Sequence, residues 1–86
     1  MRNIDNVLTD IVSKYKFDTL EYTVIQSNEI DGIWVVEVRN KSREDSFLKI
    51  EILNNDGIPA CCVLERRNVG YSSMSAFMNR LVDALE

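Results

Sequence analysis

The chain has no histidine, and this absence excludes several kinds of catalytic and metal site. Ser–His–Asp and Cys–His nucleophile systems need an imidazole as general base, and two cysteines alone cannot supply the four ligands of a structural zinc site. The three glycines, Gly32, Gly57 and Gly70, are isolated, so the sequence contains no glycine-rich phosphate loop. We therefore expect a protein that is not an enzyme and that uses no metal ion or cofactor.

Long apolar runs are missing as well. No stretch approaches the roughly 20 apolar residues that cross a bilayer, and Asp5, Asn6 and Asp10 interrupt the segment in which a signal peptide would be apolar. The two cysteines, Cys61 and Cys62, are adjacent, which is not the spacing of a secreted disulfide framework. These features predict a cytoplasmic protein without membrane contact.

Length and composition are those of one small globular domain over residues 1–86. Apolar residues make up 45% of the chain and charged residues 28%, which is ordinary for a folded protein. The net charge of −4 gives no overall basic field that would attract nucleic acid or an anionic membrane. A domain of this size buries a small core, so a partner or a second copy could add to its burial.

Helical periodicity appears at both ends of the chain. Residues 3–16 carry apolar side chains at helical spacing, with Asn3 placed to cap the first turn. Residues 72–86 repeat the pattern, and Ser72 or Ser73 is expected to cap that helix after a turn at Gly70. The two apolar stripes are Ile4, Val7, Leu8, Ile11, Val12 and Tyr15 in the first helix, and Met74, Phe77, Met78, Leu81, Val82 and Leu85 in the second.

Between the helices, four runs are typical of β-strands. Turn-forming segments at residues 28–32, 40–45 and 54–57 separate them. Pro59 near the start of the last run favours an edge position, because proline has no N–H to donate to a neighbouring strand. The four predicted strands are Glu21–Ser27, Ile33–Arg39, Phe47–Leu53 and Ile58–Glu65.

The short connections favour antiparallel neighbours in chain order. We therefore predict an α+β fold in two layers, a four-stranded antiparallel meander with N- and C-terminal helices in the order α-β-β-β-β-α. The order of elements resembles that of a double-stranded-RNA-binding domain. However, Ser72-Ser73-Met74-Ser75-Ala76 stands where such a domain opens its last helix with lysines, and the Gly-Pro and His loop is missing, so we do not assign that family.

The second face of the predicted sheet is the first candidate surface. If both helices pack on the face of Trp34, Val36 and Val38, the other face is left open, and large open apolar patches often mark binding sites. The alternative is one helix on each face. The residues predicted to bind a partner there are Ile33, Val35, Phe47, Leu53 and Val63, with Cys61 beside them.

One end of the sheet is the second candidate surface. Basic residues gather where the second and fourth strands end, and the second helix begins there with free backbone donors that suit an anion. The alternative is a solvated loop whose charges pair locally. The residues predicted to bind an anion or nucleic acid are Arg39, Lys41, Arg43, Arg66, Arg67, Ser72 and Ser73.

Other polar and reactive residues have simpler interpretations. Glu37 and Glu51 are expected to form ion pairs with Arg39 and Lys49 on the sheet. Cys61 and Cys62 should point to opposite faces of their strand, so a joint redox or metal role is less favoured than packing as small apolar side chains.

The leading hypothesis is a small non-catalytic protein-interaction module of adaptor, subunit or inhibitor type. It would bind a protein partner through the sheet face or form a homodimer. Eight asparagines and eight isoleucines suit a low-GC genome, so a phage-encoded protein that acts on a host protein fits this composition. The alternative hypothesis is a nucleic-acid-binding protein that uses the basic end of the sheet and the start of the second helix.

Overall fold

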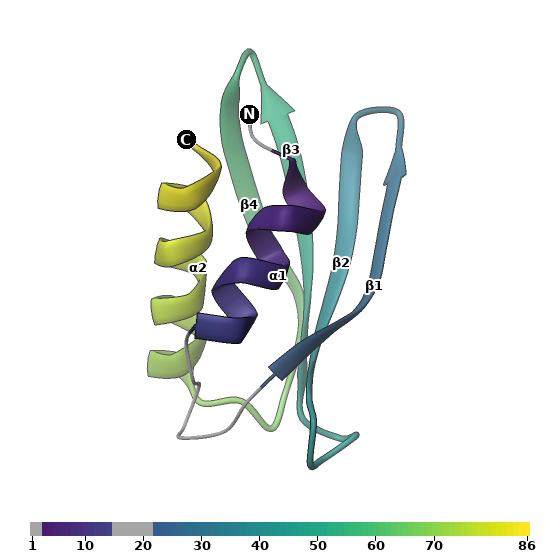
Figure 1. Ribbon diagram of the computed structural model, residues 1–86, viewed down its shortest axis with the longest axis vertical. Coiled ribbons are helices and arrows are strands. Elements are labelled where there is room, and N and C mark those ends of the chain that lie inside the picture. Colours follow the sequence, from purple (N-terminus) through teal and green to yellow (C-terminus); the bar gives the residue numbers. More distant parts are fainter. Residues whose placement is uncertain (1–2, 15–21) are drawn as a thin grey trace.

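The computed structural model describes residues 3–14 and 22–86. It confirms the predicted α+β fold and its α-β-β-β-β-α order (Figure 1). Tyr15 and Lys16, with which the first helix was predicted to end, lie outside the described residues. The elements are α1 (Ile4–Lys14), β1 (Tyr22–Ile30), β2 (Ile33–Asn40), β3 (Phe47–Asn55), β4 (Ile58–Arg67) and α2 (Tyr71–Leu85).

The four strands form one antiparallel sheet in the order β1-β2-β3-β4, so the predicted meander is confirmed. β4 lies at one edge of the sheet, as Pro59 indicated. The pairing of β3 with β4 shifts register between Lys49 and Ile50, where β4 contains one extra residue. Such a bulge increases the local twist and makes an edge strand a poorer template for another chain.

Two tight turns connect β1 to β2 and β3 to β4. Asp31-Gly32 and Asp56-Gly57 have positive φ at both positions (55° and 79°, 53° and 83°), the pattern of a type I′ turn. The strands therefore run up to the two turn residues, and the predicted turns at residues 28–32 and 54–57 were too long. As a result β1 ends at Ile30 and β3 at Asn55, beyond the predicted ends.

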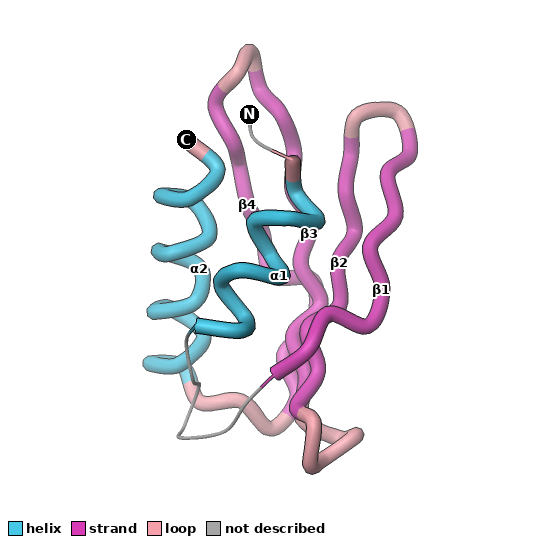
Figure 2. Tube along the Cα trace, in the orientation of Figure 1, coloured by secondary structure: helices cyan, strands magenta, loops and turns pink. Residues whose placement is uncertain are grey.

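Both helices pack on the same face of the sheet, so the alternative of one helix on each face is wrong (Figures 1 and 2). α2 lies along β4, and α1 contacts both α2 and β1. The side chains that form the core between the helices and the sheet are apolar and buried: Ile4, Val7, Leu8, Ile11, Val12, Val36, Val38, Leu48, Ile50, Ile52, Val69, Phe77, Leu81 and Leu85.

The two helices begin in different ways. The Asn6 N–H donates to Asn3 Oδ1 at 3.0 Å, which confirms the predicted cap of α1. α2 begins at Tyr71 with Gly70 as its N-cap and no capping side chain, so the prediction that Ser72 or Ser73 caps it was wrong. Among the described residues, neither helix is long and apolar enough to span a membrane.

Candidate functional site

No helix of the described chain covers the second face of the sheet, which we call the open face (Figure 2). Its side chains form cross-strand rows, because directly paired residues of antiparallel strands share a face. From the β2–β3 loop toward the hairpin tips, the rows over β2, β3 and β4 are Arg39–Phe47–Arg67, Glu37–Lys49–Glu65, Val35–Glu51–Cys62 and Ile33–Leu53–Ala60.

The half of the open face near the β2–β3 loop is charged. Phe47 lies between two guanidinium groups, with Arg39 Cζ 5.1 Å and Arg67 Cζ 5.5 Å from the centre of its ring. Arg39 Nη2 also pairs with Glu37 Oε2 at 3.0 Å, and Arg67 Nη2 with Glu65 Oε2 at 3.3 Å. The Phe47 side chain is therefore only 8% exposed although no helix covers it, and it offers little apolar surface to a partner.

The half near the hairpin tips is mainly apolar, with Glu51 lying between Val35 and Cys62. Ile30 pairs with Ile33 across the first hairpin, and Ile58 follows the second turn on the same face as Ala60. Ile30 is 70% exposed, Ile58 65% and Ile33 37%. We call this group the open-face patch; its residues are Ile30, Ile33, Val35, Leu53 and Ile58, with Ala60 and Cys62 at the β4 side.

A shallow pocket lies within the open-face patch. Ile30, Asp31, Ile33 and Val35 line it, and its volume is about 290 Å³. The two turns that flank the patch are held by local geometry; the Gly32 N–H, for example, donates to Glu29 Oε1 at 2.6 Å. The backbone that carries these apolar side chains is thus already ordered before a ligand binds.

The structure unites Ile33, Val35 and Leu53 from the predicted partner-binding set, but it places Val63 elsewhere. Val63 pairs with Ile50 and Cys61 with Ile52, and both pack against the core on the helix-covered face. Their assignment to the open face was therefore wrong. Burial there raises the pKa of the Cys61 thiol.

Sequence reasoning missed Ile30 and Ile58, the two most exposed isoleucines of the patch, because it placed Ile30 within a turn and did not count the register through the second turn. The signal was present in the Asp-Gly pairs. A two-residue type I′ turn fixes its flanking residues as a cross-strand pair, and this places Ile30 beside Ile33.

The predicted anion-binding residues lie where β2 and β4 end and α2 begins, at the end of the sheet opposite the hairpin tips (Figure 1). The four arginines among them have local partners, while Lys41 lies in the β2–β3 loop and Ser72 and Ser73 lie in the first turn of α2. Arg43 makes two contacts with the Asp45 carboxylate, both at 3.2 Å. The guanidinium of Arg43 accordingly holds the pKa of the Asp45 carboxyl below its usual value. Arg66 Nη1 donates to the Val69 carbonyl at 2.6 Å, and its guanidinium lies 3.8 Å from the centre of the Tyr71 ring.

The same contacts tie the β2–β3 loop to the segment between β4 and α2. Asn68 Nδ2 donates to the Asp45 carbonyl at 2.8 Å, and Ser46 Oγ donates to the Asn68 carbonyl at 2.9 Å. Asn68 has a φ of 52°, a conformation that asparagine accepts more readily than most residues. The arrangement indicates that this end of the molecule is a structural junction.

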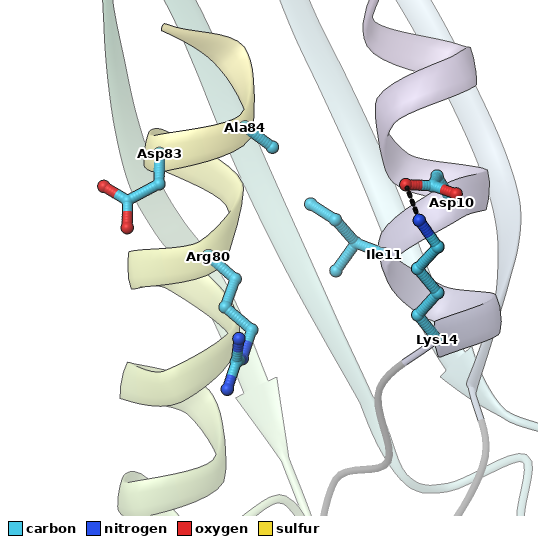
Figure 3. Close-up of a pocket in the computed structure, with 6 residues that line it drawn as sticks. All are labelled: Asp10, Ile11, Lys14, Arg80, Asp83 and Ala84. Carbon is cyan, nitrogen blue, oxygen red and sulfur yellow. Dashed lines mark ion pairs between the residues drawn. The ribbon is translucent and has the colours of Figure 1, made fainter.

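A second depression lies between α1 and α2 (Figure 3). Its volume is about 320 Å³, and Figure 3 shows Ile11 and Ala84 pointing into the space between the helices. Charged side chains surround it, and Lys14 Nζ pairs with Asp10 Oδ2 at 3.1 Å along α1. Charges of both signs line the depression, so it favours no ligand of one charge.

Within residues 3–14 and 22–86, no three cysteine, aspartate or glutamate side chains lie close enough together to hold a metal ion. A scan of the chain against models of protein families, and searches of curated proteins and of solved structures, find no significant match.

Proposed function

We propose that the protein is a small protein-interaction module that binds its partner through the open-face patch. The observation that carries the proposal is the position of both helices on one face, which leaves the isoleucines of the other face without a covering element in the described chain. Contiguous exposed apolar side chains on a small domain favour a binding surface. An adaptor, a subunit or an inhibitor would each use such a face.

Local burial supports the apolar end of the open face over its charged end. Burying an exposed isoleucine is worth about 1.5–3 kcal/mol, and Ile30 and Ile58 are still mostly exposed. Phe47, by contrast, is already covered by Arg39 and Arg67. The binding energy available to a partner is therefore concentrated near the hairpin tips.

Nucleic-acid binding at the basic end has less support. Arg39, Arg43 and Arg67 each have a carboxylate partner within 3.3 Å, so an approaching phosphate would have to compete with an existing ion pair. The substitutions Arg66→Glu and Arg67→Glu test this alternative. Nucleic-acid binding would be favoured if the wild type retains an oligonucleotide at low salt, if added salt weakens this retention steeply, and if the double variant loses it.

Affinity capture from an extract of the source cells tests the proposed function. We expect Ile33→Asp to abolish capture of the partner, because the new carboxylate would be desolvated in the contact. Its fold should persist, since Ile33 is already partly exposed. Ala76→Asp is the matched control, because Ala76 is exposed on α2 in the helix layer.

Thermal unfolding of both variants establishes that the fold is intact, and the native mass of the captured complex gives its stoichiometry. Capture that Ile33→Asp leaves unchanged, in a chain that melts like the wild type, would contradict the proposed function. Equal loss of capture in Ile33→Asp and Ala76→Asp would also contradict it, since the two side chains lie on opposite sides of the molecule.

A further inference from the structure

The charges around the open-face patch point to the chemistry of its partner, and this inference rests on the proposed function. We propose that the partner is a protein segment whose apolar side chains are flanked by lysine or arginine. One large apolar side chain of that segment would enter the pocket of Ile30, Ile33 and Val35. Its basic side chains would then lie over the carboxylates at the rim of the patch.

The patch is bordered by acidic residues at the hairpin tips, and on its other side Lys49 lies beside Glu51, in the row of Glu37 and Glu65. Neither residues 24–38 nor residues 50–65 contain a lysine or an arginine. Asp31 and Asp56 occupy the exposed turns, and Glu51 lies on the open face between Val35 and Cys62. Among the described residues, no lysine or arginine forms a salt bridge with these three carboxylates, whereas Glu37 and Glu65 further along the face are paired.

This distribution disfavours a second copy of the chain as the occupant. A two-fold axis through the patch would bring apolar side chains together, but it would also bring the carboxylates of Asp31, Glu51 and Asp56 near those of the other copy. Like charges at an interface are destabilising. The arginines of the open face lie in the Phe47 row, about 13 Å from the Glu51 row and about 20 Å from the Leu53 row along β3, and Arg39 and Arg67 already pair with glutamates there. Lys49 is nearer to Glu51, but it lies between Glu37 and Glu65.

A partner with basic flanks meets both features of the surface. The apolar pocket is bordered by Asp31, so a lysine or arginine beside an apolar anchor would fall near that carboxylate. Charges at the edge of an interface mainly set the partner's identity and the rate of association, whereas the buried apolar anchor supplies most of the affinity. The two tight turns hold the patch in place before binding, which reduces the entropy lost on association.

Two synthetic peptides of equal length serve as probes. Both carry leucines at helical spacing; one has lysine at every remaining position and the other has glutamate. Oligolysine without leucine is the third probe. Binding is measured by fluorescence anisotropy, and the contact is mapped by amide chemical shifts in the full chain. We expect the lysine–leucine peptide to bind, with shifts centred on Ile30, Ile33 and Leu53, and the other two probes to bind at least tenfold more weakly.

Two pairs of substitutions separate the rim charges from the overall charge. Asp31→Asn with Asp56→Asn removes two rim carboxylates, and asparagine readily adopts the positive φ of these turn positions. We expect this pair to weaken binding of the lysine–leucine peptide about three- to tenfold. Asp10→Asn with Asp83→Asn makes the same change in net charge on the helix layer and should leave the affinity unchanged.

Each contrary result has its own meaning. If both leucine peptides bind equally well and Ile33→Asp abolishes their binding, the open face is the binding surface but the inference of a basic partner is wrong. Failure of the lysine–leucine peptide to bind, equal weakening by the two Asp→Asn pairs, or equally tight binding of oligolysine would overturn the inference as well. A concentration-dependent dimer that Ile33→Asp abolishes would replace the basic partner with a second copy of the chain.

Discussion

Replacing Phe47 with leucine should destabilise the fold although the residue lies on the open face. Its ring is in contact with the guanidinium groups of Arg39 and Arg67. A cation–π contact at an exposed site contributes about 0.5–1 kcal/mol, and leucine keeps most of the apolar volume while removing both contacts. We therefore expect Phe47→Leu to lower the free energy of unfolding by about 1–2 kcal/mol.

Urea unfolding followed by the fluorescence of Trp34, the only tryptophan, measures this change. In a domain of this size, 1 kcal/mol corresponds to about 4–8 °C in the unfolding temperature, so a thermal melt gives a second reading. An unfolding free energy within about 0.3 kcal/mol of the wild type would refute the stabilising role of the two arginines.

A double-mutant cycle with Arg67→Met isolates one of the two contacts. Arg67 is the better partner for the cycle because its side chain is 59% exposed and that of Glu65 43%, so Glu65 stays hydrated when the arginine is removed. The cycle should give a coupling energy of about 0.5–1 kcal/mol between Phe47 and Arg67. Because Phe47 stabilises the fold through these two contacts, Phe47→Asp would weaken the fold itself and is therefore a poor probe of binding.

Three further predictions concern the thiols, the turns and the basic end. Cys62 should react with iodoacetamide well before Cys61, since Cys62 is exposed while burial raises the pKa of the Cys61 thiol. Tandem mass spectrometry of the labelled peptide shows which cysteine is modified first, and equal rates would contradict the assigned faces. Gly57→Val should cost about 1–2 kcal/mol in urea unfolding, because Gly57 has a φ of 83°; no change would contradict the type I′ turn. The pKa of the Asp45 carboxyl is lower in the folded state than in the unfolded state, so this group stabilises the fold at pH values above its unfolded-state pKa. That stabilisation is lost as the pH falls through the folded-state pKa. Asp45→Asn should therefore reduce the acid dependence of unfolding below about pH 4, and an unchanged pH profile would exclude that contribution.

Periodicity was sufficient to predict the helices and the pairing order of the strands. The five apolar residues from Ile4 to Val12 that were expected to face inward are all buried, and so are Val36 and Val38 on the expected face of β2. These patterns are informative because each element has one apolar face and one polar face. The short connections then left few ways to arrange the strands.

β4 was harder to predict because both of its faces carry apolar residues. Apolar and polar residues do not alternate in Ile58–Leu64, so the pattern does not predict which side chains face the helices. The face on which Val63 lies depends on the strand register alone. The Asp56-Gly57 turn sets that register, since it makes Asn55 and Ile58 a pair and thus places Cys61 opposite Ile52. Counting outward from the turn would have placed Val63 on the helix-covered face.

The burial of Phe47 illustrates a different limit. A single strand pattern treats every residue of the open face alike, yet Phe47 is covered and Ile33 is not. The difference comes from long basic side chains on the two neighbouring strands, which lie across the ring. Such covering depends on cross-strand neighbours, and it becomes predictable only after the register is known.

Binding through the open-face patch is tested most directly by a photoreactive amino acid at Ile33, with the same residue at Ala76 on α2 as its control. Irradiation in an extract of the source cells should join the Ile33 variant to one protein of defined mass, and the Ala76 variant should give no such product. The cross-linked peptide of the partner should contain lysine or arginine beside its apolar residues. Cross-linking of the same protein by the Ala76 variant but not by the Ile33 variant would contradict binding through the open face.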